Sequence, residues 1–481
     1  MDSIHRKATD PSIRINMLMN VLLTLSSIII PVITLPYVTR VLGAEGVGRV
    51  YFASSAVAGF AMFAELGIPV YGIRACARVR ENRAELSRTV REIMAVNLIS
   101  CLIVCICFAF LLRTVPRFAE DKPLLMIMSS TMILNCIGAE WMYKALEKYT
   151  YITIRSLIFK VIALAAMFVM VRDSSDYVIY GAITIFAVSA SNIMNLFMIH
   201  RYADLRPSGR HDLARHLPGM LMLFALAAAT TVYTNLDLAI LDFIKGDAEA
   251  GLYGVAVRIK LVIVSLVTSV SAVLLPRNSF YYEKERREDS FRLLSQTMKM
   301  ILILSVPAAV YFMMFARESI MILAGYGFSG AVKPMITIMP AVVFIGISNI
   351  IGIQMLVPQG REKTVVKAAL AGAAADLALN FILIPVYAST GAAAATLAAE
   401  IFVAGYMMCS VRSDLRTLFK GVPIKAMIAS LAGMIAVGSL VRAEVNGAFL
   451  RIFISSICCF GVYSLIMYSA MRISRNDPGS I

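Results

Sequence analysis

The sequence is poor in charged residues and in the side chains that build most metal and catalytic sites. Only 16% of the 481 residues are Asp, Glu, Lys or Arg, with 4 His and 1 Trp. The histidines, at positions 5, 200, 211 and 216, fall in polar segments without metal-ligand spacing. The 8 cysteines are scattered and are expected to be small buried hydrophobes. We therefore expect no metal site.

Nucleotide-binding motifs and a cleavable signal are also missing. There is no G-x-x-x-x-G-K-[ST] sequence, which excludes ATP hydrolysis by that type of loop. Gly325, Gly327 and Gly330 match G-x-G-x-x-G literally, but no strand precedes them and an apolar run follows, so we reject a dinucleotide site. The first apolar run is too long for a secretory signal and has no small-residue cleavage site, so we expect it to stay as a helix.

Apolar residues dominate instead. They make up 59% of the chain, and the mean hydropathy is +0.78, which is typical of a polytopic membrane protein. At about 20 residues per span, the sequence predicts an all-α integral membrane protein with about fourteen transmembrane helices. The predicted spans are 15–38, 50–72, 93–112, 123–143, 154–171, 177–199, 217–241, 250–275, 298–316, 334–357, 364–386, 391–411, 422–441 and 448–470.

The distribution of basic residues predicts the topology. The formal net charge is +15, which in a soluble protein would suggest nucleic acid. Here, however, the two termini and alternate loops, counted together with the adjoining ends of the spans, hold 31 lysines and arginines, and the intervening loops, counted in the same way, hold 11. Basic loops stay in the cytoplasm, so both termini are predicted to be cytoplasmic, and no nucleic-acid partner is expected.

The first span has a polar face. Asn and hydroxyl side chains recur there at helical spacing, and that face cannot look at lipid without partners. It either packs against other helices or lines a water-filled cavity. Two Asn one turn apart exceed what packing needs, which favours the cavity. The residues of this face are Asn16, Asn20, Thr24, Ser27, Pro31 and Thr34.

Several charged residues fall within or next to apolar runs, where an unpaired charge is costly. Glu65 is expected to be protonated, paired or facing water. Lys160 lies close enough to the cytoplasmic end to reach the interface. Arg74 is the basic residue of its loop that lies nearest the membrane.

The eighth span contains two cations on different helical faces. Arg258 shares its face with Gly and Ser residues and is therefore expected to line a cavity. Lys260 has apolar neighbours and is expected to pair with another helix or to extend toward an interface.

Acidic residues also lie on polar faces of later spans. Asp237 follows Thr and Tyr residues on one face of the seventh span, Asp376 is one turn from Asn380, and Glu400 is one turn from Thr396.

The polar segment after the sixth span divides the predicted chain into two halves. Six helices precede it, so the seventh enters from the same side as the first, as two parallel repeats require. LGAEGVGRVY and KGDAEAGLY, each at an outer turn, form a short echo between the halves. We predict an N-terminal lobe at 1–200, a cytoplasmic linker at 201–216, a C-terminal lobe at 217–411, and two further helices with a tail at 412–481.

Four motifs resemble those of the Wzx-like polysaccharide flippases in the multidrug/oligosaccharidyl-lipid/polysaccharide exporter superfamily. They are IPVITLPYVTRVLGAEGVG at 30–48, ELGIPVYGIRACAR at 65–78, EWMYKALEKY at 140–149 and GLYGVAVRI at 251–259. The resemblance implies two six-helix lobes around a central cavity, plus two C-terminal helices, in the bacterial inner membrane. It also implies a basic residue at Arg258 and at Arg74.

The implied function is transport of undecaprenyl-pyrophosphate-linked oligosaccharide from the cytoplasmic to the periplasmic leaflet, without catalysis, for surface polysaccharides such as O-antigen or exopolysaccharide. An anionic headgroup cannot cross hydrocarbon unaided, and a cavity with Arg donors replaces its lost hydration. Membrane lipids and other polysaccharide-assembly proteins are further candidate partners. The candidate cavity residues are Arg258, Arg74, Asn16, Asn20, Thr24, Lys260 and Lys160.

No cofactor is expected, but proton or sodium coupling is an open alternative. Asp237, Glu65, Asp376 and Glu400 are candidates either for coupling or for structural charge pairing. Three other functions remain open: a lipid II flippase, a cation-coupled multidrug antiporter and a membrane enzyme that joins lipid-linked sugars. Arg258 argues against the antiporter. The predicted outer loops are too short to hold a catalytic domain, which argues against the enzyme.

Overall fold

The computed structural model describes residues 13–206, 212–283 and 286–476, and within these ranges all regular structure is helical. The all-α prediction is therefore confirmed. The helices of the first half are α1 (Ile13–Glu65), α2 (Ile68–Arg78), α3 (Arg83–Thr114), α4 (Pro116–Glu120), α5 (Lys122–Gly138), α6 (Glu140–Ala145), α7 (Tyr149–Met170), α8 (Tyr177–Ile185), α9 (Asn192–Met198) and α10 (Leu217–Lys245).

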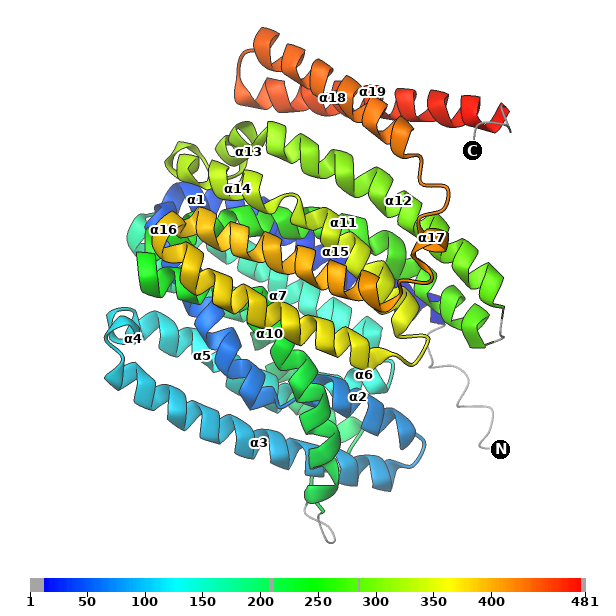
Figure 1. Ribbon diagram of the computed structural model, residues 1–481. Coiled ribbons are helices and arrows are strands. Elements are labelled where there is room, and N and C mark those ends of the chain that lie inside the picture. The colour runs from blue at the N-terminus through cyan, green and yellow to red at the C-terminus, as the bar shows by residue number, and fades with distance from the viewer. Residues whose placement is uncertain (1–12, 207–211, 284–285, 477–481) are drawn as a thin grey trace. The chain divides into compact units, whose positions relative to one another are not determined.

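The second half of the chain is also built of helices (Figure 1). Its helices are α11 (Asp247–Glu283), α12 (Arg287–Met314), α13 (Ala316–Leu323), α14 (Val332–Ile338), α15 (Ala341–Asn349), α16 (Glu362–Ser410), α17 (Leu415–Leu418), α18 (Ile424–Glu444) and α19 (Ala448–Asn476). Two π-helical segments, Phe186–Ala190 and Ile350–Leu356, continue α8 and α15.

Nine helices in the described ranges are long and apolar enough to cross a membrane, or ten if a bent pair counts as one span. Each of the fourteen predicted stretches falls mainly on helix: α16 contains two of them, and α1 contains the first and most of the second, which ends in α2. α1 turns at Gly43, which has φ 69°, and α16 turns at Ala388, which has φ 48°. The tight outer turn predicted after the first span is therefore made by a single left-handed residue. The protein is a multi-pass membrane protein.

The chain forms two compact units, Met1–Ala239 and Ile240–Ile481. The boundary falls inside α10, after the polar segment 201–216. The division into two lobes and a linker remains a prediction, because a compact unit of the chain need not be one structural repeat.

The first unit has two hydrophobic clusters. One gathers Phe52 of α1, Phe108 of α3 and Met128 of α5. The other is centred on Ile68 of α2, Ile93 of α3 and the short helix α6. Helix α3 belongs to both clusters and so links them along its length.

The outward face of α3 is apolar. Leu98, Leu102, Ile106 and Phe110, spaced one turn apart, are 49–65% exposed, whereas Asn97 is buried. A row of large exposed aliphatic and aromatic side chains is unfavourable in water and suits a lipid-facing surface.

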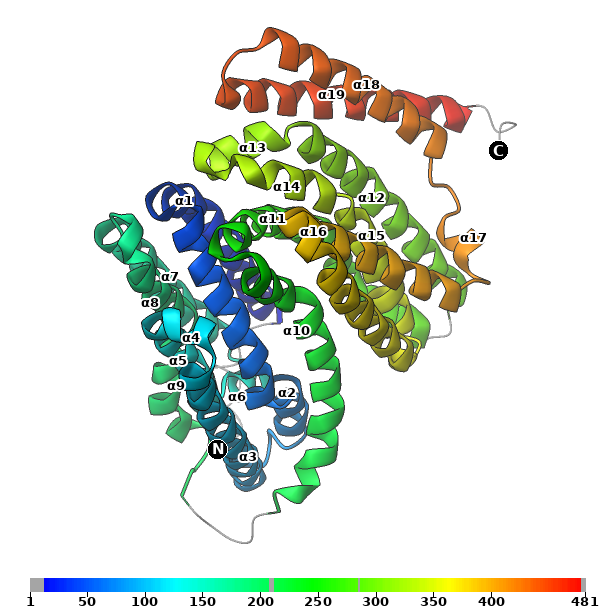
Figure 2. The same ribbon diagram turned by 60° about the vertical axis from the view of Figure 1, so that its left-hand side comes forward.

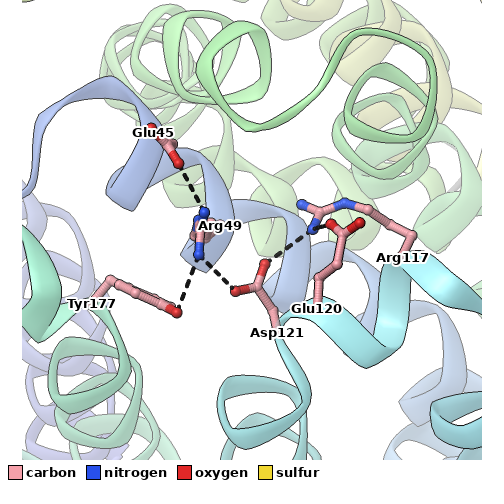
Figure 3. A network of polar contacts seen from close by, with 6 residues as sticks. All are labelled: Glu45, Arg49, Arg117, Glu120, Asp121 and Tyr177. Carbon is pink, nitrogen blue, oxygen red and sulfur yellow. Dashed lines mark hydrogen bonds and ion pairs between the residues drawn. The ribbon is translucent and has the colours of Figure 1, made fainter.

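A charge network ties three helices of the first unit together, and Figure 3 shows its geometry. The buried carboxylate of Asp121 accepts from Arg49 of α1 at 3.2 Å and from Arg117 of α4 at 3.0 Å. Arg49 also bonds Glu45 and the hydroxyl of Tyr177 on α8. By the predicted topology this network is at the outer side, where it holds α1 beyond its turn against α4 and α8.

In the second unit, α18 and α19 form a hairpin, and the two helices stay side by side in both views (Figures 1 and 2). A buried carboxylate on α13 fastens this hairpin, because Glu318 accepts from Arg451 at 2.9 Å and pairs with Arg442 at 3.5 Å. The hydroxyl of Tyr311 on α12 adds a bond to Ser455 of α19.

Candidate functional site

A buried cation on α7 provides the clearest polar site in the first unit. The ammonium group of Lys160 donates to the hydroxyls of Ser26 and Ser27 on α1, at 2.9 and 2.8 Å. Lys160 is 9% exposed, and the hydrogen-bond partners of its ammonium in the described structure are these neutral hydroxyls rather than a carboxylate. A buried ammonium with neutral hydroxyl partners has no compensating charge beside it, which is expensive for a purely structural residue.

The polar face of the first span is therefore partly explained. Ser27 of that face meets Lys160, and Thr153 of α7 donates to the backbone oxygen of Met19, so α1 and α7 pack along this stripe. Asn20 and Thr24 are exposed, and the Thr24 hydroxyl donates to the Asn20 carbonyl. The side chain of Asn16 is outside the part of the structure that can be described.

A second buried cation lies on the same helix, nearer its start. Arg155 donates from Nη2 to Glu140 of α6 at 2.9 Å, and the other oxygen of Glu140 accepts from Lys144 at 2.8 Å. Arg155 is 3% exposed, and its Nε and Nη1 have no acceptor. The ring of Tyr151 lies below the guanidinium, with its centroid 5.7 Å from Cζ.

These groups form a cluster with an excess of positive charge. Its members are Glu140, which pairs with Lys144 and Arg155, and Lys160, which lies five residues after Arg155 on α7. One carboxylate thus pairs with two cations, and the third cation, Lys160, has hydroxyl partners instead.

Glu65 is the centre of a separate polar network. Its carboxylate accepts from the amide of Asn135 on α5 at 3.2 Å, and the Asn135 oxygen accepts in turn from Ser189 and Asn192. Ser189 lies in the π-helical segment that follows α8, and π-helical turns are frequent at functional sites. No arginine or lysine within salt-bridge distance is recorded for Glu65, so its partners in the described structure are neutral amides.

The other predicted residues are distributed over both units. Arg74 of α2 and Arg258 of α11 are exposed, and Lys260 of α11 is buried. Three acidic residues, Asp237 of α10 and Asp376 and Glu400 of α16, are all buried.

Within the second unit, the hydroxyl of Tyr253 on α11 bonds that of Thr396 on α16 at 2.8 Å. This bond brings the Arg258 helix against the Glu400 helix. The roles of Arg258, Lys260 and the three acidic residues remain predictions.

Sequence reasoning missed a second carboxylate cluster at the polar segment that follows α9. Glu92 of α3 is fully buried and accepts from Arg88 at 3.0 Å, from His216 at 2.9 Å and from Arg215 at 2.5 Å. It also accepts from the backbone N–H of Asp212 at 3.0 Å.

The contacts of this cluster extend to α2 and along α3. The other nitrogen of His216 bonds the hydroxyl of Tyr71 at 2.7 Å. Further along α3, the Ser87 hydroxyl accepts from the backbone of Asp204. The end of the segment before α10 is therefore pinned to α2 and α3.

Arg155 was also missed, because its position near a predicted cytoplasmic loop made it look like an ordinary positive-inside residue. A weak signal existed in its spacing. Arg155 and Lys160 fall on the same helix as two cations without an acidic residue between them.

Comparison with known proteins identifies the family. A family model described as "Polysaccharide biosynthesis protein" matches residues 13–282, more than half of the chain. The chain belongs to this family. The matched region includes α1, α7 and the clusters around Lys160 and Glu65.

Two relatives of this family member are described as putative O-antigen transporters. The relative from Escherichia coli strain K12 is 23% identical over 405 residues, which cover 84% of this chain and 97% of the relative. The relative from Shigella dysenteriae is 25% identical over 403 residues, with 82% and 99% covered.

Solved structures share the fold. The lipid II flippase MurJ in an inward closed conformation matches with a TM-score of 0.74 at 18% identity, covering 96% of this chain and 99% of that one. An inward-facing multidrug transporter of the MATE family in the MOP superfamily matches with a TM-score of 0.63 at 13% identity, covering 84% and 99%. At these identities the likeness shows the fold alone.

Proposed function

We propose that this member of the polysaccharide biosynthesis family is a flippase that moves an undecaprenyl-pyrophosphate-linked oligosaccharide across the bacterial inner membrane. Family membership and the two relatives described as putative O-antigen transporters support this class of function. Both chain ends are cytoplasmic in this proposal, as the distribution of lysine and arginine indicates.

The observation that carries the proposal is the buried ammonium of Lys160. It is held by two neutral hydroxyls, and the nearby Arg155 and Lys144 share a single carboxylate. A site for a cationic drug needs carboxylates, whereas a site for a diphosphate needs cations that remain unneutralised until the ligand arrives. The charge balance of the first unit favours the anionic ligand.

The remaining cavity residues extend this site. Asn20 and Thr24 continue the α1 stripe that meets Lys160, with Asn16 before them, and provide amide and hydroxyl groups suited to sugar or water. Arg74, Arg258 and Lys260 supply further positive charge for the headgroup as the two lobes alternate in access.

Energy coupling is assigned to Glu65 in this proposal. Its hydrogen-bond partner is a neutral amide, so a proton or a sodium ion can neutralise the carboxylate without breaking an ion pair. Asp237, Asp376 and Glu400 are the corresponding candidates on the later helices.

The test measures where the lipid-linked repeat unit lies. In cells lacking this gene, a glycan probe restricted to the periplasm should detect less lipid-linked repeat unit on the outer leaflet. Restoration by the wild-type gene, and no restoration by Lys160→Met, is the expected result. Normal exposure in the deletion strain would contradict the function and direct attention to drug efflux.

A further inference from the structure

Arg155 is a buried guanidinium that the protein itself leaves incompletely bonded. Its side chain is 2% exposed, and one of its three nitrogens, Nη2, donates to Glu140. Nε and Nη1 are enclosed and have no acceptor. Buried donors without acceptors lose hydration that nothing replaces, so they are rare in folded proteins and call for an explanation.

The carboxylate opposite Arg155 is shared. Glu140 uses its second oxygen for Lys144 and is 33% exposed, so it is open to solvent on one side. The same short stretch of chain has three more enclosed polar atoms without a partner, Nε1 of Trp141 and the hydroxyls of Thr150 and Tyr151. Incomplete bonding is therefore concentrated on α6 and the first turn of α7.

We propose that Arg155 is an oxyanion-binding residue that takes a diphosphate group from the cytoplasmic side, in exchange for part of its contact with Glu140. This inference rests on the proposed function for the choice of diphosphate. The chemistry of the site by itself requires a phosphate-like oxyanion, because planar guanidinium donors match such oxygens in both charge and spacing.

The charges around Arg155 favour replacement of part of its contact with Glu140 by the ligand. With no ligand, Glu140 compensates one of the three neighbouring cations. A diphosphate supplies acceptors for Nε and Nη1 and balances the excess charge of Lys144 and Lys160. The ring of Tyr151 lies over the guanidinium and this residue is only partly buried, so we expect its side chain to move when the anion binds Arg155.

By the predicted topology, the α6–α7 connection is cytoplasmic. An anion bound there would be at the leaflet from which the proposed transport begins. Arg155 would then receive the headgroup, and Lys160, five residues further along α7, would hold it deeper in the membrane. The two cations thus have different roles in one path.

The sequence provides its own reporter for a binding test. Trp141 is the single tryptophan of the protein and follows Glu140 directly. We expect inorganic pyrophosphate, added at constant ionic strength to the purified full-length protein in detergent, to change Trp141 emission in a saturable manner. Arg155→Gln should weaken this binding by about tenfold or more, because it removes charge-assisted hydrogen bonds. Arg155→Lys should retain part of the affinity.

Two further variants keep the test decisive if Arg155→Gln folds poorly. Glu140→Gln removes the competing carboxylate and should tighten pyrophosphate binding, whereas a purely structural ion pair would leave the affinity unchanged or abolish folding along with it. Arg80→Gln is the matched control, since Arg80 is a surface arginine paired with Glu147 on the same predicted side. Equal affinities in wild type, Arg155→Gln and Glu140→Gln would overturn the proposal.

The source of the phosphate is tested in lipid nanodiscs. Discs that contain a polyprenyl diphosphate should change Trp141 emission in a manner that depends on Arg155. An equal change with the same fraction of phosphatidylglycerol would overturn the assignment to a diphosphate substrate. The Arg155 subsite and the transport function can fail separately. Normal transport by Arg155→Gln would refute only the subsite. Normal outer-leaflet glycan in the deletion strain would refute only the transport function.

Discussion

Glu92 anchors the polar segment that precedes α10, and its removal should release that segment from α3. The substitution Glu92→Gln keeps the shape of the side chain but removes the charge that faces two arginines and His216. The new side-chain amide also places N–H donors where other donors already converge, and two donors cannot bond each other. The existing donors belong to Arg88, Arg215, His216 and the Asp212 backbone.

The magnitude follows from the burial of the groups. Removal of one partner from a buried ion pair costs about 3–5 kcal/mol. Glu92 is fully buried, but Arg88 and Arg215 are 43% and 40% exposed and regain water when the carboxylate is lost. The expected cost is therefore below that range, about 2–3 kcal/mol, which corresponds to a detached population roughly 30-fold to 150-fold larger.

The assay is limited proteolysis of the native protein with trypsin, followed by the appearance of the two half-chain fragments. When opening is fast relative to cleavage, the cleavage rate reports the detached population, so Glu92→Gln should be cut faster by a similar factor at Arg215, which directly precedes His216. Glu85→Gln, an exposed carboxylate on the same helix, is the control. Identical cleavage rates for both variants and wild type would show that the Glu92 contacts do not hold this segment.

Three further predictions concern charge and backbone. Lys160→Met should leave the unfolding temperature unchanged or raise it, because an apolar chain of similar length replaces a buried charge. The same variant should sharply reduce the lipid-linked glycan on the outer leaflet. An equal loss of transport in Lys160→Arg would refute a role for charge alone. Asp121→Asn should lower stability by about 2–3 kcal/mol in thermal unfolding, because Arg49 and Arg117 lose their shared carboxylate, and the exposed neighbour substitution Glu120→Gln should cost under about 1 kcal/mol. Gly67→Ala should lower the folded yield, since φ is 73° and an added Cβ would lie 2.6 Å from the Met220 backbone oxygen; wild-type yield would show that α2 and α10 can separate without cost.

The buried charges in the described structure are compensated in two ways. The carboxylates of Asp121, Glu92 and Glu318 are each held by at least two basic groups and serve the architecture. Lys160 and Arg155 are held by hydroxyls or by a shared carboxylate. The difference in compensation separates structural charges from those that await a ligand.

The amino-acid sequence by itself determined the fold class, because about 20 consecutive apolar residues can be satisfied in a membrane only as a helix. It also determined that one face of the first span is polar and that Glu65 and Lys160 lie within apolar runs. Periodicity reports which residues share a helical face, so these expectations depended on local sequence alone.

Only the tertiary structure decided which faces meet. Lys160 and Ser26 are 134 residues apart, and Glu92 and His216 are 124 apart, so no spacing rule could pair them. Arg155 and Glu140 are separated by only 15 residues, but they meet because the chain reverses between α6 and α7 near Glu147, which has φ 56°. A helical pattern fixes the direction of each side chain about the helix axis. Which side chain it meets depends on how the helices pack against one another, and this packing brings the charged residues together into sites.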